Sequence, residues 1–158
     1  MKIKDNINTD YVISGRYKFK IQDPKELAKY IFEDLDPAFA ARVKKGDILV
    51  AGENFGCGSS REQAVSTLKG HEIIIIARNF ARIFFQNSIN LGLQTITCPD
   101  VEANEGDELD ITVGEVVNKT NGKSFRIEPM PKARQAIIEA GGLIAYTRKR
   151  VMEKASMR

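Results

Sequence analysis

The stretch Gly52-Glu53-Asn54-Phe55-Gly56-Cys57-Gly58-Ser59-Ser60-Arg61-Glu62 is the most informative segment of this 158-residue chain. It directly follows a short apolar run at 47–51, which predicts a β-strand, and it leads into a helix predicted over 61–69. Its three glycines let the backbone turn tightly and approach a ligand closely, because glycine has no Cβ. The first N–H groups of a helix lack intrahelical partners. A strand, a glycine loop and a helix start together therefore predict a site for an anionic oxygen.

Two hydroxyls and a guanidinium, those of Ser59, Ser60 and Arg61, lie at this junction. One serine alone would serve as a helix N-cap, with Glu62 as a weak capping-box partner. Such a cap needs at most one of the nearby glycines, so the loop favours carboxylate or phosphate binding. A phosphate-binding P-loop requires a lysine before its final Ser or Thr, and 52–62 contains no lysine. The glycine spacing also differs from the dinucleotide-binding fingerprint.

Apolar periodicity on both sides of the loop predicts an α/β fold. The predicted helices are 24–35, 37–43 and 79–91, and the further strands are 72–77, which contains four consecutive isoleucines, and 94–97. Two strand–helix crossovers in succession predict a central, mostly parallel sheet flanked by helices.

Three local features refine this prediction. Residues 1–20 are predicted to be extended and loop-like. Gly70 is predicted to lie just after its helix as a left-handed stop, and Gly92 is predicted to end the helix over 79–91. Asn79 is predicted to cap the start of that helix.

The last third of the chain predicts a β-rich C-terminal attachment. Short strands are predicted over 108–113, 115–118 and 124–127, with Asn121-Gly122 as a hairpin turn. Pro131 starts a last helix, which Gly141-Gly142 stops. The basic tail beyond it is predicted to be a solvated helix end or a frayed terminus. Without a linker or a repeat, residues 1–158 are predicted to form a single domain.

Composition excludes several functional classes. Apolar residues make up 42% and charged residues 28% of the chain, and neither a membrane-spanning run nor a signal-peptide segment is present. We therefore expect a cytoplasmic protein that binds no membrane. The net charge of +3 lacks a basic stripe interleaved with aromatics, so no nucleic-acid partner is expected. Cys57 and Cys98 show no metal-binding spacing, and the only histidine, His71, makes a hydrolase triad hard to build.

Several segments, in one order along the chain, resemble the small subunits of isopropylmalate isomerases in the aconitase superfamily. These segments are the loop at 52–62, Ile-Ala-Arg-Asn-Phe-Ala-Arg-Ile-Phe-Phe-Gln-Asn at 76–87, Asn-Thr-Asp at 8–10 and Gly-Arg-Tyr at 15–17. The resemblance implies the swivelling β/β/α domain as the fold. It also implies a separate large subunit that carries a [4Fe–4S] cluster on three cysteines. The present chain has two, unsuitably spaced, so it is expected to bind no cofactor and to be half of an enzyme.

The resemblance also implies roles for individual residues. Ser59 matches a serine that acts as an alkoxide base and removes a proton from carbon. Arg61 matches an arginine that binds a substrate carboxylate, a task that suits its planar fork of donors. Ser60 is expected to help hold the substrate, and Asp10 matches an acidic residue at the rim of the site, with Thr9 assisting. The implied reaction isomerises 2-isopropylmalate, a hydroxy-diacid, to 3-isopropylmalate by dehydration and rehydration.

Substrate choice is implied to depend on a loop just after Gly-Arg-Tyr. An arginine two places after that tyrosine accompanies homoaconitate-like substrates, and here this position is Phe19. An apolar ring suits an isopropyl group and leaves a carboxylate unpaired. Lys18 and Lys20 flank it and would serve a longer diacid if the loop shifted by one residue. Isopropylmalate is favoured. The alternatives are the small subunit of homoaconitase or of a methyl-substituted malate dehydratase, an RNA-binding module, and a stand-alone anion-binding domain.

Overall fold

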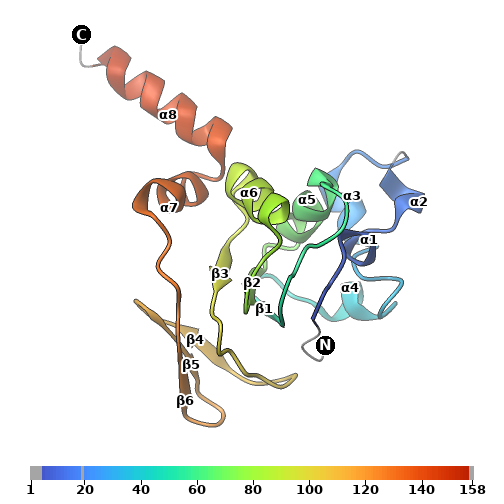
Figure 1. Cartoon of the computed structure of the whole chain (residues 1–158). Helices are drawn as coiled ribbons and strands as arrows, with labels where there is room; N and C mark the ends of the chain where they lie inside the picture. The colour runs from blue at the N-terminus through green and yellow to red at the C-terminus, as the bar shows by residue number, and fades with distance from the viewer. Residues whose placement is uncertain (1–4, 19, 157–158) are drawn as a thin grey trace.

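A three-stranded parallel sheet lies at the centre of the protein, whose computed structural model describes residues 5–18 and 20–156 (Figure 1). Its strands stand in the order β1 (Ile48–Ala51), β2 (Ile74–Ala77) and β3 (Thr95–Thr97). The register pairs Ile48 with Ile74 and Ile75 with Thr95. The crossovers between them are the helices α5 (Glu62–Gly70) and α6 (Arg82–Leu91). The predicted parallel sheet is thus confirmed.

A second, antiparallel sheet forms the β-rich attachment. It contains β4 (Leu109–Ile111), β5 (Glu115–Asn118) and β6 (Lys123–Arg126) in that order. The predicted Asn121-Gly122 turn lies in the connection between β5 and β6, where Gly122 takes a φ of +75°. Figure 1 shows this sheet beside the end of β3, away from the N-terminal helices. The described chain therefore has the predicted α/β architecture.

Two hydrophobic clusters cover opposite faces of the parallel sheet. Leu49 and Ile75 point into the larger cluster, which includes residues of α5 and α6. Their neighbours Ile48 and Ile76 point into the smaller cluster with Phe125 of the antiparallel sheet. Successive side chains of a strand alternate between faces. The central strands thus belong to both clusters, which explains why 72–77 reads as a continuous apolar run.

The N-terminal region is helical where an extended chain is predicted. Residues Thr9–Val12 form α1 and Gly15–Lys18 form α2. The Asn8 side chain caps α1, accepting a hydrogen bond from the N–H of Asp10. The prediction for residues 1–20 is therefore wrong for these two segments, because a local side-chain cap initiates α1.

The helices predicted over 24–35 and 37–43 are shorter in the structure. They are α3 (Pro24–Ala28) and α4 (Phe39–Arg42), joined by turns. Phe32 takes a φ of +56° and its N–H donates to the carbonyl of Val12, 3.0 Å away. Its side chain is fully buried. A tertiary contact with α1 therefore overrides the helical periodicity.

Two of the predicted helix ends are wrong. Gly70 is the last residue of α5, and its Cα faces α3, where a Cβ would lie 2.9 Å from the carbonyl oxygen of Pro24. Gly70 therefore allows two helices to approach closely. The N-cap of α6 is Ala81, and the Asn79 side chain instead accepts a hydrogen bond from the N–H of Asn54. Gly92, at a φ of +74°, ends α6 as predicted.

The C-terminal region ends in two helices, α7 (Lys132–Glu139) and α8 (Leu143–Ser156). The basic tail, predicted to be a solvated helix end or a frayed terminus, lies in a 14-residue helix without a buried residue, in agreement with the first alternative. It projects from the rest of the molecule (Figure 1). Within the described ranges, no helix has the length and apolar character needed to cross a membrane.

The corner before α8 is a contact between main chains. A Cβ on Gly92 would lie 2.4 Å from the carbonyl carbon of Gly141, and one on Gly142 would lie 2.7 Å from the carbonyl oxygen of Asn90. The Lys69 ammonium donates to the carbonyls of Leu91 and Gly141. The end of α6 and the start of α8 therefore touch without side chains between them.

Candidate active site

The glycine loop runs from the end of β1 to the start of α5 and is held from two sides. The N-terminal segment lies along one side, where Thr9 N–H donates to the carbonyl of Cys57 and Gly56 N–H to the carbonyl of Ile7, each at 2.8 Å. On the other side, the N–H of Ala81 donates to the carbonyl of Phe55 at 2.9 Å. Segments distant in sequence thus fix the loop through backbone hydrogen bonds.

Two loop glycines are required by their surroundings. Gly58 has a φ of +95°, and a Cβ there would lie 2.2 Å from Oδ1 of Asn8. Gly56 has a φ of +81°, and a Cβ there would lie 2.1 Å from the ring of Phe84. Because both backbone conformations are costly for other residues, the loop depends on glycine at both positions.

The hydroxyls of Ser59 and Ser60 are exposed and make no hydrogen bond with any described residue. The N-cap of α5 is Arg61, which makes no side-chain capping bond. The interpretation of a serine as a helix cap is therefore wrong. The carbonyl of Ser59 is fixed, since it accepts from the hydroxyl of Thr9 at 3.0 Å and from the N–H of Arg61 at 2.7 Å. The hydroxyls themselves are free to meet a ligand.

The guanidinium of Arg61 lies beside Asp10, with Nη1 2.5 Å from Oδ1. The Arg61 side chain is only 17% exposed, whereas Asp10 is 52% exposed. Despite the ion pair, the buried Nε and Nη1 of Arg61 have no aligned hydrogen-bond acceptor among the described residues. Leaving a buried donor unpaired costs about 1–3 kcal/mol. The Arg61 guanidinium therefore has N–H groups left to donate to the oxygens of an anionic ligand.

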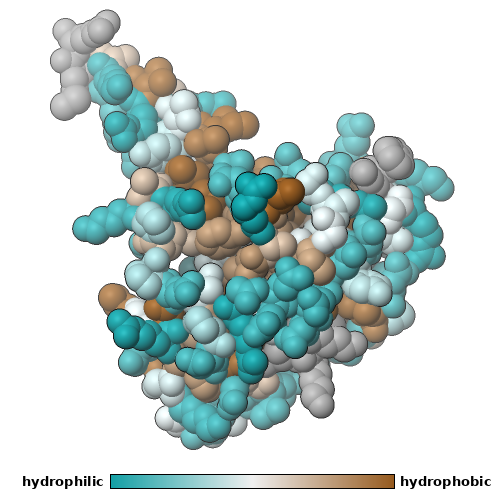
Figure 2. Space-filling view, viewed as in Figure 1, coloured by the Kyte–Doolittle hydropathy of each residue, from teal (hydrophilic) through white to brown (hydrophobic). Residues whose placement is uncertain are grey.

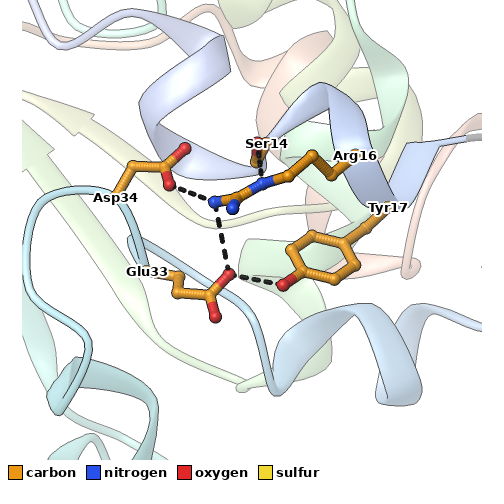
Figure 3. A network of polar contacts seen from close by, with 5 residues as sticks. All are labelled: Ser14, Arg16, Tyr17, Glu33 and Asp34. Atoms are coloured by element: carbon orange, nitrogen blue, oxygen red, sulfur yellow. Dashed lines mark hydrogen bonds and ion pairs between the residues drawn. The ribbon is translucent and has the colours of Figure 1, made fainter.

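The base of the predicted specificity loop is held by a polar network (Figure 3). Arg16 donates to Asp34 and lies 3.8 Å from Glu33, and the Tyr17 hydroxyl donates to Glu33 at 2.7 Å. This hydrogen bond raises the pKa of Tyr17, whose ring stacks on that of Tyr30 at 4.0 Å. The start of the loop is therefore firmly positioned.

The three predicted specificity residues themselves are only partly described. Phe19 lies outside the described residues. Lys18 is the last residue of α2, and Lys20 is exposed beyond it. Their contact with a substrate stays a prediction.

The structure brings five of the predicted site residues together. They are Ser59, Ser60 and Arg61 from the loop with Thr9 and Asp10 from α1. Two asparagines that position the loop were not predicted to do so. Asn8 touches Gly58 and caps α1, and Asn79 holds the N–H of Asn54. A signal for Asn8 is present, since Asn directly before Thr-Asp is a typical start of a helix.

The donor set of the described chain does not fit a metal ion or an iron–sulfur cluster. No group of three or more His, Cys, Asp or Glu side chains converges among the described residues. Of the two cysteines, Cys98 is buried and its thiol donates to the carbonyl of Arg126. Burial raises its pKa from 9.0 to about 11. The thiolate is the form of cysteine that binds metal. Because the raised pKa keeps the Cys98 thiol protonated near neutral pH, we interpret Cys98 as a structural residue.

The fold and the site define the chain as an aconitase-type domain, since residues 5–101 match the family described as the aconitase C-terminal domain. The chain belongs to the family of 3-isopropylmalate dehydratase small subunits. It is 48% identical to that subunit of Thermodesulfovibrio yellowstonii, over 95% of this chain and 92% of the relative. It is likewise 48% identical to that of Methanosarcina mazei, over 97% and 96%. These matches confirm the resemblance read from the motifs.

A solved structure agrees with this assignment. The crystal structure of 3-isopropylmalate dehydratase from Methanocaldococcus jannaschii matches with a TM-score of 0.93 and 41% identity. The match covers 99% of this chain and 95% of that one. Such coverage includes the N-terminal helices, both sheets and α8, so the whole described fold is that of the family.

Proposed function

We propose that this chain is the small subunit of a hydro-lyase of leucine biosynthesis, which isomerises 2-isopropylmalate to 3-isopropylmalate by dehydration and rehydration. One observation carries the proposal. The Arg61 guanidinium is largely buried with unpaired N–H groups, and it lies beside two free serine hydroxyls on a glycine loop. A hydroxy-diacid offers both the carboxylate that Arg61 needs and the carbon-bound proton that a base removes.

Arg61 binds one carboxylate of the substrate. Its planar guanidinium donates two parallel hydrogen bonds to a carboxylate, which fixes the orientation of the ligand as well as its position. Asp10 already lies at Nη1 and orients the side chain, while the Nε edge has no acceptor among the described residues. Ser60 lies next to Arg61 in the chain and supplies a further hydroxyl to the substrate.

Ser59 removes the proton from carbon as an alkoxide and returns a proton in the rehydration step. Lowering its pKa by about four units requires about 5–6 kcal/mol of differential stabilisation. Backbone N–H groups of the loop and the nearby Arg61 charge are the sources in this chain, and exclusion of water strengthens both. Thr9 holds the carbonyl of Ser59 at 3.0 Å, so it positions the base.

The proposal includes a separate large subunit that carries a [4Fe–4S] cluster and covers the loop. The names of the relatives call them small subunits, and the donor set described above does not fit a cluster on this chain. The cluster would act on the leaving hydroxyl, and the present chain would supply the base and the carboxylate-binding arginine. The free thiols of Cys57 and Cys98 agree with a reducing, cytoplasmic location.

The test is anaerobic turnover of 2-isopropylmalate by this chain mixed with its cluster-loaded large subunit, beside each subunit alone. We expect activity in the mixture only. Ser59→Ala should lower kcat by about 10²–10⁴-fold, because this is the contribution of a general base. Arg61→Lys should raise KM and lower kcat, since lysine keeps the charge but loses the fork.

Two outcomes contradict the proposal. Full activity of Ser59→Ala would remove this residue as the base. Turnover of homoaconitate without turnover of isopropylmalate would assign the chain to the alternative substrate and shift attention to Lys18 and Lys20.

A further inference from the structure

The helix α8 carries an exposed apolar stripe. Leu143 is 42%, Ile144 78% and Val151 62% exposed. At about 100° per residue, these three side chains lie within about 100° of the helix circumference. Met152, 63% exposed, widens the stripe on one side. Figure 2 shows hydrophobic residues gathered along the projecting helix. Four large apolar side chains on one exposed helix indicate a binding surface.

The rest of the described chain leaves this stripe uncovered. No residue of α8 is buried, and the helix packs mainly on α7 and α6 near its own start. Beyond that corner it projects into solvent (Figure 1). The stripe therefore serves a partner outside this chain.

Charge argues against a second copy of the chain as that partner. Within α8, four basic residues accompany one acidic residue, Glu153; the basic residues are Arg148, Lys149, Arg150 and Lys154. By helix geometry, Arg148 lies between Ile144 and Met152 around the helix axis. Lys154 lies between Leu143 and Val151. Both basic side chains therefore border the apolar ones. Two such helices packed on each other would bring like charges together, which is destabilising. The complementary surface is an apolar groove with acidic side chains at its rim.

The small area of the stripe indicates that the partner also contacts other parts of this chain. A 14-residue helix is about 21 Å long, and one face of it buries far less than the ~800 Å² that each side of a stable interface contributes. The stripe must therefore add to a larger contact. The helix α6 links the two regions, because Phe84 packs against Gly56 of the glycine loop and the end of α6 touches the start of α8.

We propose that α8 docks into an acidic-rimmed apolar groove on the large subunit, as an outlying part of the interface that covers the site. This inference rests on the proposed function, since it requires the large subunit. It assigns α8 to assembly and not to chemistry, so its loss weakens association and leaves turnover in the assembled enzyme intact.

The experiment titrates the full-length chain against the cluster-loaded large subunit and measures both Kd and kcat at saturation. The double variant Ile144→Glu/Val151→Glu places two carboxylates in the stripe and should raise Kd at least about 10-fold. The matched control is Lys149→Glu, which changes the net charge by the same two units on the opposite face of α8 and should change Kd by less than about 2-fold. Circular dichroism checks that each variant is folded. In all three proteins kcat at saturation should be the same.

Salt provides a second readout. Because basic side chains flank the stripe, raising the ionic strength should weaken association of the wild-type chain. Replacing Arg148 and Lys154 by glutamine should reduce this dependence.

The outcomes separate this inference from the proposed function. If the wild-type chain neither binds nor activates the large subunit, the proposed function fails. If it does both and the stripe variant binds equally well, the role of α8 is overturned. Light scattering of the chain alone, and sedimentation with vesicles of anionic lipid, test the other occupants. A dimer or a vesicle complex that Ile144→Glu/Val151→Glu abolishes would also overturn the inference.

Discussion

At the scale of single residues, the site depends on small side chains that hold backbone in place. Asn8 caps α1 through the N–H of Asp10, and its Oδ1 occupies the space that a Cβ on Gly58 would fill. Thr9, fully buried, ties α1 to the carbonyl of Ser59. The backbone that carries the two serine hydroxyls is therefore positioned by small neighbouring side chains.

Replacement of Gly58 by alanine tests this dependence. The φ of +95° costs about 1 kcal/mol or more for alanine, and the new Cβ would collide with Asn8. We expect Gly58→Ala to lower the free energy of unfolding by about 2–4 kcal/mol and kcat by at least about 10-fold. Urea unfolding and turnover with the large subunit measure the two effects.

Gly114 is the matched control for that substitution. Its φ is +93°, and a Cβ there would meet no atom within 4 Å. Gly114→Ala should therefore cost only about 1 kcal/mol of backbone strain and leave kcat unchanged. Equal effects of the two substitutions would show that Asn8 does not constrain the loop.

The candidate site residues are easier to find in the sequence than the residues that position them. Ser59, Ser60 and Arg61 follow from a local motif, because a glycine loop before a helix is readable within eleven residues. The contact between Asn79 and the N–H of Asn54 spans 25 residues. A cap prediction for Asn79 considers only its own helix, so it could not include this partner.

At the scale of helices and strands, long-range contacts set most of the unpredicted boundaries. The helix α3 stops at Ala28 because Phe32 turns inward and bonds to Val12. The helix α5 runs through Gly70 because the glycine lets it pack on α3. Strand positions were predicted closely, since a strand buried on both faces leaves a continuous apolar run in the sequence.

Cys98 connects the two sheets through a hydrogen bond, and its titration makes the free energy of unfolding depend on pH in the alkaline range. It follows β3, and its thiol donates to the carbonyl of Arg126 in β6. Burial raises its pKa from 9.0 to about 11, so on raising the pH the unfolded chain loses this proton first. Stability therefore falls as the pH rises from about 9 to about 11, by at most about 3 kcal/mol.

Urea unfolding at about pH 8 and about pH 10.5 measures this loss. In Cys98→Ala the decline between the two pH values should be smaller than in the wild-type chain, whereas Cys57→Ala should leave it unchanged. An identical decline in Cys98→Ala would assign the alkaline loss of stability to other groups.

At the scale of the whole molecule, the two hydrophobic clusters share the central strands. Ile75 faces one cluster and Ile76 the other, so loss of either cluster exposes one side of β2. The prediction of a single domain over 1–158 follows from the same arrangement and remains to be tested by unfolding.

Truncations in the two clusters make that test. Leu68→Ala, in the cluster beneath α5, and Phe125→Ala, in the cluster beneath β6, should each cost about 2–5 kcal/mol. In a single domain, each should shift one common transition seen by circular dichroism and by tyrosine fluorescence. A transition that splits in two for Phe125→Ala would mean that the antiparallel sheet unfolds by itself.

The main-chain corner formed by Gly92, Gly141 and Gly142 has an evolutionary consequence. Backbone atoms and Lys69 set the direction of α8, while the exposed side chains set what the helix meets. The direction of α8 and the chemistry of its exposed surface can therefore change independently of each other. Substitutions of the exposed side chains can adapt α8 to changes in the surface of its partner. The direction of the helix stays the same as long as the three glycines remain.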